Sequence, residues 1–200
     1  MAGITQTPAS GSSPEAPVTP IDGSLLRQLL RSATTWLERN AATVDALNVF
    51  PVPDGDTGTN MLLTMRAAVE AAEKAKATGA GQIMKAAAQG AVMGARGNSG
   101  VILSQILAGM ARGLGEHATC DGTVLAAALA EGATTAYRAV TRPVEGTILT
   151  VARAAGDGAT AAAAQMTAGG APSCRHVLER ALVAAQEAVE RTPEQLPVLR

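Results

Sequence analysis

The sequence has few aromatic residues, few cysteines and almost no net charge, and each shortage excludes a class of protein. Only 2% of the residues are aromatic, so the core must be built mainly from Ala, Leu, Val, Ile and Met, which favours closely packed helices. The formal net charge of -1 provides no basic surface for nucleic acid. Cys120 and Cys174 form neither a CxxC pair nor a cluster with histidine, so we expect buried, inert thiols rather than a zinc or redox site.

Long hydrophobic runs are also missing. No uncharged apolar run is long enough to span a bilayer, and the first residues lack a basic stretch followed by an apolar one. We therefore expect a cytoplasmic protein without a membrane span. Pro, Ser, Thr, Ala and Gly dominate residues 1–21, which predicts a disordered tail, and residues 22–200 are long enough to form one helical domain.

Apolar residues recur at helical spacing along most of the chain. They predict a first helix from about Ser24, which is its expected N-cap, and a short helical piece over 41–47. Asp121 and Ser173 are expected to begin two later helices. Further predicted helices cover about 61–72, 82–93 and 102–114, the helix after Asp121 carries apolar residues from 125 to 140, and another begins at Ile148. Because no β-branched run alternates with polar residues between turn signals, the predicted class is all-α.

Two carboxylates in a loop between helices are the first candidate site. Asp54 and Asp56 stand two residues apart in the segment 48–60, just before a helix start. Carboxylate oxygens suit Mg²⁺, and a helix N-terminus offers free N–H groups to phosphate. The simpler alternative is that both aspartates form Asx-turns and cap the helix. An EF-hand is excluded, because Thr59 and Met65 stand where that loop needs Gly and Glu.

A glycine-rich segment between two helices, residues 94–100, is the second candidate. It could hold a phosphate or a ribose, although glycines between helices also serve as C-caps and allow close packing. The sequence has neither a P-loop nor the motifs of protein kinases. Since Arg96 is the only basic residue beside either segment, a bound metal must neutralise most of the charge of a polyphosphate.

Three blocks of sequence resemble one known family. ALNVFPVPDGDTGTNM over 46–61, GARGNSGVILSQ over 94–105 and RPVEGTILTV over 142–151 are similar to the ATP-binding domain of bacterial fatty acid kinases. These enzymes belong to a wider family that includes the nucleotide-binding subunit of dihydroxyacetone kinase. The resemblance implies a closed barrel or bundle of about eight amphipathic antiparallel helices, with nucleotide bound at one end.

The resemblance also implies a set of site residues. Asp54 and Asp56, with Asn48, would bind two Mg²⁺ ions, and the two aspartates would be central to catalysis. The phosphates of ATP or ADP would contact Thr57, Gly58, Thr59 and Asn60. Phosphate and ribose would contact Asn98, Ser99 and Gly100, and the nucleoside would contact Thr147 and Ile148. Thr57 replaces the histidine of dihydroxyacetone kinases, which favours the fatty acid kinase branch.

By the same resemblance, the chain would transfer the γ-phosphoryl group of ATP to the carboxylate of a fatty acid held on a carrier protein. It would be the N-terminal part of a longer kinase, whose C-terminal domains engage that carrier. Two alternatives remain open at this point. One is a dihydroxyacetone-type kinase that acts on a small ketose, and the other is a non-catalytic module that senses nucleotide.

Overall fold

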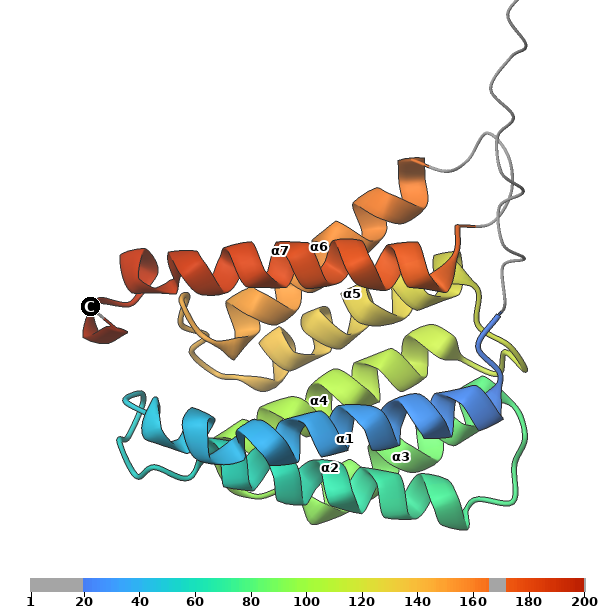
Figure 1. Ribbon diagram of the computed structural model, residues 1–200, viewed down its shortest axis with the longest axis horizontal. Helices are drawn as coiled ribbons and strands as arrows, with labels where there is room; N and C mark the ends of the chain where they lie inside the picture. Colours follow the sequence, from blue (N-terminus) through green and yellow to red (C-terminus); the bar gives the residue numbers. More distant parts are fainter. Residues whose placement is uncertain (1–19, 166–171, 200) are drawn as a thin grey trace, which may run out of the picture.

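The computed structural model describes residues 20–165 and 172–199, and this part of the chain consists of helices joined by short connections (Figure 1). The all-α prediction is confirmed, and the only β-type pairing among the described residues is one isolated bridge. The helices are α1 (Gly23–Ala46), α2 (Thr57–Lys74), α3 (Ala80–Gly94), α4 (Gly97–Leu114), α5 (Gly122–Ala139), α6 (Ile148–Gln165), α7 (Cys174–Gln195) and the short 3₁₀ helix η1 (Pro197–Leu199).

Side-chain caps fix where three of the helices begin. Asp121 accepts a hydrogen bond from Val124 N at 2.9 Å, and Ser173 accepts one from His176 N at 3.1 Å, so both predicted starts are confirmed. The first helix differs from the prediction. Asp22, rather than Ser24, caps α1 by accepting from Leu25 N at 2.8 Å. A carboxylate at this position also complements the positive end of the helix dipole.

The boundary of the N-terminal tail is also corrected. Most of the predicted tail, residues 1–19, lies outside the described residues. Ile21, however, is only 5% exposed, and it exchanges two backbone hydrogen bonds of 2.8 Å with Cys120. The folded part of the chain therefore includes Ile21, because a buried side chain and a paired backbone tie it to the connection before α5.

Three helix boundaries differ from the expected ones. The piece predicted over 41–47 is the end of the continuous helix α1, α2 begins at Thr57 rather than near 61, and α4 begins at Gly97 rather than near 102. The first turns of α2 and α4 are built from Gly, Thr, Asn and Ser, so they carry no apolar period that sequence reasoning could detect. The predicted phosphate-facing residues therefore lie in helix first turns and not in loops.

The core is built from small side chains. Alanines from four helices, among them Ala68, Ala87 and Ala128, are fully buried. A methyl group added at Gly109 would lie 2.6 Å from the Cα of Gly132, so α4 and α5 approach each other at glycine-to-glycine distance. The aromatic side chains stay outside this core, and Trp36 is 69% exposed. The core therefore contains few aromatic side chains because the helices pack closely through faces of alanine and glycine.

The described helices form one bundle whose helix count is close to the predicted one. The resemblance implied about eight helices in a closed barrel, whereas the described residues form seven α-helices. Helix α1 packs on α2 and α3, and α7 packs on α5 and α6. Both helices keep exposed apolar side chains, including Trp36 on α1 and Leu182 and Val189 on α7. Among the described helices, none is long and apolar enough to cross a membrane.

The antiparallel arrangement gathers the candidate segments at one end of the bundle. Figure 1 shows the α1–α2 and α5–α6 connections at the left end, with the N-termini of α2 and α6 beside them. Helix α4 runs parallel to α2 and contacts it directly. The fold therefore places the N-termini of α2, α4 and α6 at the same end, where their dipoles present positive charge.

Candidate functional site

The first turns of α2 and α4 touch each other through small residues. Ser99 Oγ donates to Thr57 Oγ1 at 3.3 Å. Gly97 has φ +55° and lies so close to Asn60 that an added methyl group would be 2.3 Å from its Nδ2 atom. Gly100 approaches the hydroxyl of Thr64 equally closely. The structure thus brings the two predicted phosphate-binding segments, 57–60 and 98–100, into one site.

Asp45, at the C-terminal end of α1, holds the start of α2. Its Oδ1 accepts from Thr59 N at 3.0 Å, and its Oδ2 accepts from Thr59 Oγ1 at 2.7 Å. These bonds lower the pKa of Asp45, with the Thr59 hydroxyl as the largest cause. A lowered folded pKa stabilises the fold at pH values above the ordinary carboxyl pKa, and this contribution is lost as the pH falls through the lowered value.

Sequence reasoning missed Asp45, because it precedes Thr59 by 14 positions and belongs to a different helix. Nothing in the local pattern marks it as a cap. Only the antiparallel packing of α1 on α2 brings its carboxylate to the free N–H groups of the α2 first turn.

The carboxylate of Asp56 is uncommitted. Asp56 occupies the N-cap position of α2, yet its side chain makes no capping hydrogen bond, and within the described residues it has no other hydrogen bond or ion pair. Asp54 is exposed and accepts one bond, from Asn48 Nδ2 at 3.1 Å. The capping role that sequence alone allowed for Asp56 is therefore filled by Asp45, which leaves the Asp56 carboxylate free for a ligand.

Asn48 organises the loop that carries the two aspartates. Its Nδ2 donates to Val52 O at 2.6 Å as well as to Asp54, and its Oδ1 accepts from the hydroxyl of Thr57. The amide therefore links the loop to the first residue of α2. Its amide oxygen has a second lone pair, so Asn48 could bind a metal while it keeps the contact with Thr57.

The donor set fits a magnesium ion that is shared with a polyphosphate. In the part of the chain that the structure describes, no group of three or more His, Cys, Asp and Glu side chains gathers at one place. Mg²⁺ does not need such a cage, because it commonly binds one or two carboxylates together with substrate phosphates and water. Asp54 and Asp56 supply two hard oxygen donors beside two helix N-termini, which is the arrangement that this chemistry requires.

The backbone of the α4 first turn is open to an anion, whereas in α2 the Thr59 N–H already donates to Asp45. The first helical bonds are donated by Asn60 N to Asp56 O at 2.8 Å in α2, and by Gly100 N to Arg96 O at 3.0 Å in α4. Arg96 N donates to Thr64 Oγ1 at 3.3 Å, but no side chain caps α4, so the N–H groups of Gly97, Asn98 and Ser99 are available to phosphate oxygens. Gly58 is buried, and a methyl group there would lie 2.2 Å from Ala41 O.

Thr147 and Ile148 lie at the start of α6, in the α5–α6 connection. Thr147 Oγ1 donates to Val144 O at 2.8 Å and accepts from Leu149 N at 3.3 Å, so the threonine caps the helix. No hydrogen bond among the described residues joins this connection to the Asp54 loop. The structure therefore places Thr147 and Ile148 at the same end of the bundle as Asp54, while their contact with a nucleoside remains a prediction.

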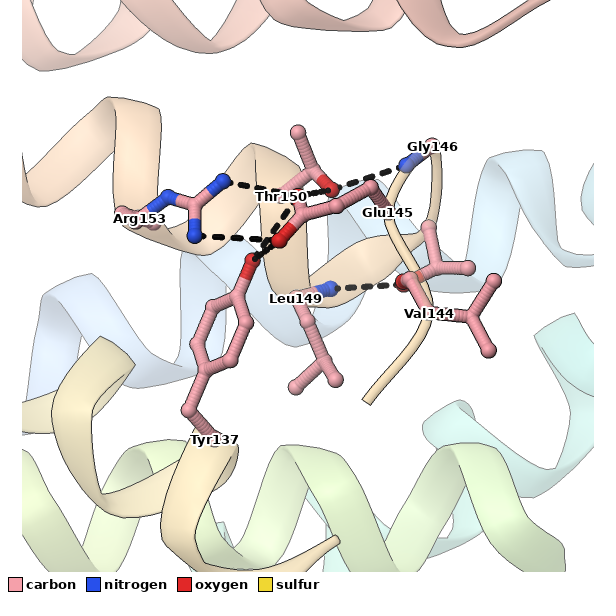
Figure 2. Close-up of polar contacts among 8 residues, drawn as sticks. Tyr137, Val144, Glu145, Gly146, Leu149, Thr150 and Arg153 are labelled. Atoms are coloured by element: carbon pink, nitrogen blue, oxygen red, sulfur yellow. Dashed lines mark hydrogen bonds and ion pairs between the residues drawn. The ribbon is translucent and has the colours of Figure 1, made fainter. Parts of the chain in front are cut away.

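Glu145 ties the α5–α6 connection to both helices, and sequence reasoning did not single it out. Figure 2 shows its carboxylate accepting from Thr150, from the hydroxyl of Tyr137 and from both Nη atoms of Arg153. The bonds are 2.6 Å to Thr150, 3.2 Å to Tyr137, and 2.7 and 3.1 Å to Arg153. The Thr150 hydroxyl, and after it Arg153, lowers the pKa of Glu145.

Arg153 completes this cluster from the α6 side. Its guanidinium lies 4.8 Å from the centre of the Tyr137 ring, in a cation–π arrangement. Gly146, at φ +78°, donates its N–H to Thr150 Oγ1 at 2.9 Å. The backbone before Thr147 is thus held from both sides, which fixes the shape of the α6 N-terminus.

Comparisons with known proteins identify the family of the chain. Residues 51–200 match a family described as the DAK2 domain. An uncharacterized protein of Staphylococcus saprophyticus and two uncharacterized proteins of Staphylococcus aureus are each 43% identical over 183 residues, which is 92% of this chain and 32% of each relative. The chain thus spans about one third of the length of these relatives. It belongs to the DAK2 domain family, the dihydroxyacetone kinase-like family that includes the domain of fatty acid kinases.

Proposed function

We propose that this chain is the Mg²⁺-dependent ATP-binding domain of a fatty acid kinase, and that it transfers the γ-phosphoryl group to a fatty acid carboxylate held on a carrier protein. The observation that carries this proposal is the uncommitted carboxylate of Asp56. It stands at the start of α2 and beside the first turn of α4, while Asp45 does the capping. A carboxylate that merely capped a helix would not be left free in this way.

The chain's own groups would act by position and by charge. The N–H groups of the α2 and α4 first turns that no side chain caps would hold phosphate oxygens, and Gly97 and Gly100 let the two first turns pack closely against each other. Asp54 and Asp56, with Asn48 beside them, would hold the metal. Mg²⁺ bound there would neutralise charge on the β- and γ-phosphates during in-line transfer.

The acceptor proposed here suits a site without a general base. A carboxylate is already ionised near neutral pH, so it attacks phosphorus without losing a proton. His117 follows α4 and His176 lies in the first turn of α7, both at the end of the bundle away from Asp56. Neither histidine is therefore positioned to take a proton from an alcohol acceptor, which favours the fatty acid over dihydroxyacetone.

The acceptor and its carrier would be bound by domains beyond this chain. Because the chain spans only 32% of its relatives, these proteins have ample length for such domains. Two alternatives compete with this proposal. A dihydroxyacetone-type kinase would use the same phosphate site with a ketose, and a nucleotide-sensing module would bind ADP without turnover.

Titration of ATP into the 200-residue chain, with and without Mg²⁺, tests the binding part of the proposal. We expect heat of binding in isothermal titration calorimetry only when Mg²⁺ is present, because the N–H groups and Arg96 alone carry too little positive charge for a triphosphate. If ATP binds with equal affinity in excess EDTA, the aspartates do not act through a bound metal, and the proposal is contradicted.

A further inference from the structure

The two cysteines of the chain meet at the end of the bundle away from Asp56. Cys174 is the first residue of α7, and its thiol donates to Cys120 O at 3.3 Å, although the two residues are 54 positions apart. Both are free thiols, with exposed fractions of 1% for Cys120 and 6% for Cys174. The sequence spacing hides this pair, because only the packing of the helices brings it together.

The backbone around the pair is held firmly on both sides. Cys120 exchanges two hydrogen bonds of 2.8 Å with Ile21, and Gly122 N donates to Pro172 O at 3.0 Å. A methyl group at Gly122 would lie 2.2 Å from that same oxygen. Pro172, just before α7, therefore lies directly against the start of α5, and this contact holds the Cys174 thiol 3.3 Å from the Cys120 backbone oxygen.

We infer that Cys120 and Cys174 form a reversible disulfide, with a low-molecular-weight disulfide such as glutathione disulfide as the oxidant. Cys174 is the attacking thiol. The N-terminus of α7 favours its thiolate, and the hydrogen bond between the two thiols lowers the pKa of Cys174 while it raises that of Cys120. Attack takes place when the first turn of α7 opens, since both thiols are buried in the closed state.

The reaction balances in two exchange steps. In the first, the thiolate of Cys174 bonds to one sulfur of glutathione disulfide, whose S–S bond breaks to release one glutathione. In the second, the thiolate of Cys120 attacks the Cys174 sulfur of the mixed disulfide and releases the second glutathione. Two electrons pass from the cysteine pair to the oxidant, and the two thiol protons end on the two glutathione molecules.

A redox titration of the 200-residue chain tests this inference. The chain is equilibrated in glutathione buffers, quenched with acid and alkylated, and its intact mass is measured, with the same chain in urea as the reference. Formation of the disulfide lowers the mass by two hydrogens. We expect the midpoint of this change to occur at a ratio of oxidised to reduced glutathione at least about 100-fold lower for the folded chain than for the unfolded chain. The reason is that the fold raises the effective concentration of one thiol at the other. Equal midpoints in buffer and urea would overturn the inference.

Variants and melting temperatures separate the internal disulfide from other thiol chemistry. Cys120→Ser and Cys174→Ser should each lose the two-hydrogen product. Oxidation should raise the melting temperature of the wild-type chain by about 10 °C, because the bond closes a long loop in the unfolded state, and it should leave both variants unchanged. If the wild-type chain acquires only glutathione adducts, or melts at the same temperature after oxidation, the inference is wrong. The wild-type results decide the matter even if a variant folds poorly.

Discussion

Asp56→Asn is expected to weaken Mg²⁺-dependent binding of ADP by at least about 100-fold, because the change removes one of only two carboxylates available to the metal. The helical circular dichroism should not change, since the Asp56 side chain makes no contact that holds the fold together. Asp54→Asn should show the same loss. Calorimetric titration in the presence of Mg²⁺ measures the affinity.

Asp121→Asn is the matched control for this experiment. It makes the same chemical change at another helix N-cap, at the end of the bundle away from the site. Asn caps helices about as well as Asp, so both the melting temperature and the ADP affinity should stay near the wild-type values. If Asp54→Asn and Asp56→Asn also keep magnesium-dependent affinity, the two aspartates do not bind the metal.

Gly58→Ala is expected to destabilise the protein by about 3 kcal/mol, through overpacking against rigid backbone. The added methyl group would lie 2.2 Å from Ala41 O and 2.9 Å from Ala41 Cα, both of them backbone atoms of α1. No side chain can move to relieve this contact, so α1 and α2 must separate. Nucleotide affinity should fall as well, because the α2 first turn carries the phosphate-facing residues.

Urea unfolding followed by circular dichroism measures this effect, and Gly79→Ala provides the comparison. At Gly79 the nearest atom to an added methyl group is the Cα of Ala118, at 3.4 Å, an ordinary contact distance. That variant should lose less than about 1 kcal/mol, mostly from the poorer capping by Ala. A similar loss in both variants would mean that the close approach of α1 and α2 does not limit stability.

Much of the fold could be predicted because most helices bury an apolar stripe of regular period. Helix α3 and the starts of α5 and α7 were placed correctly by apolar spacing and by the caps Asp121 and Ser173. The first turns of α2 and α4 escaped prediction, because their polar residues are helical only in the tertiary context, where Gly58 and Gly100 fit against neighbouring helices. Helix α1 was predicted as two pieces because the polar residues around Asn40 interrupt the apolar spacing, although the helix is continuous.

The candidate site could be predicted from motifs only as far as those motifs are local in sequence. Asp54 and Asp56 stand out because two carboxylates share one loop. Asp45 and Glu145 do not, because each acts on partners that packing supplies from another helix or turn. The choice between a capping and a ligand-binding aspartate also required the structure, because it depends on whether a second carboxylate already holds the α2 N-terminus.

Formation of acyl phosphate is the measurement that tests the proposed function most directly. A longer protein that joins this chain to the domains expected after residue 200 is mixed with Mg-ATP and a carrier loaded with fatty acid, and hydroxylamine traps the product as a hydroxamate. We predict that hydroxamate forms, that Asp56→Asn abolishes it, and that dihydroxyacetone does not replace the fatty acid. Consumption of ATP only with dihydroxyacetone would contradict the choice of acceptor, and tight nucleotide binding without turnover of either acceptor would instead support a nucleotide-sensing module.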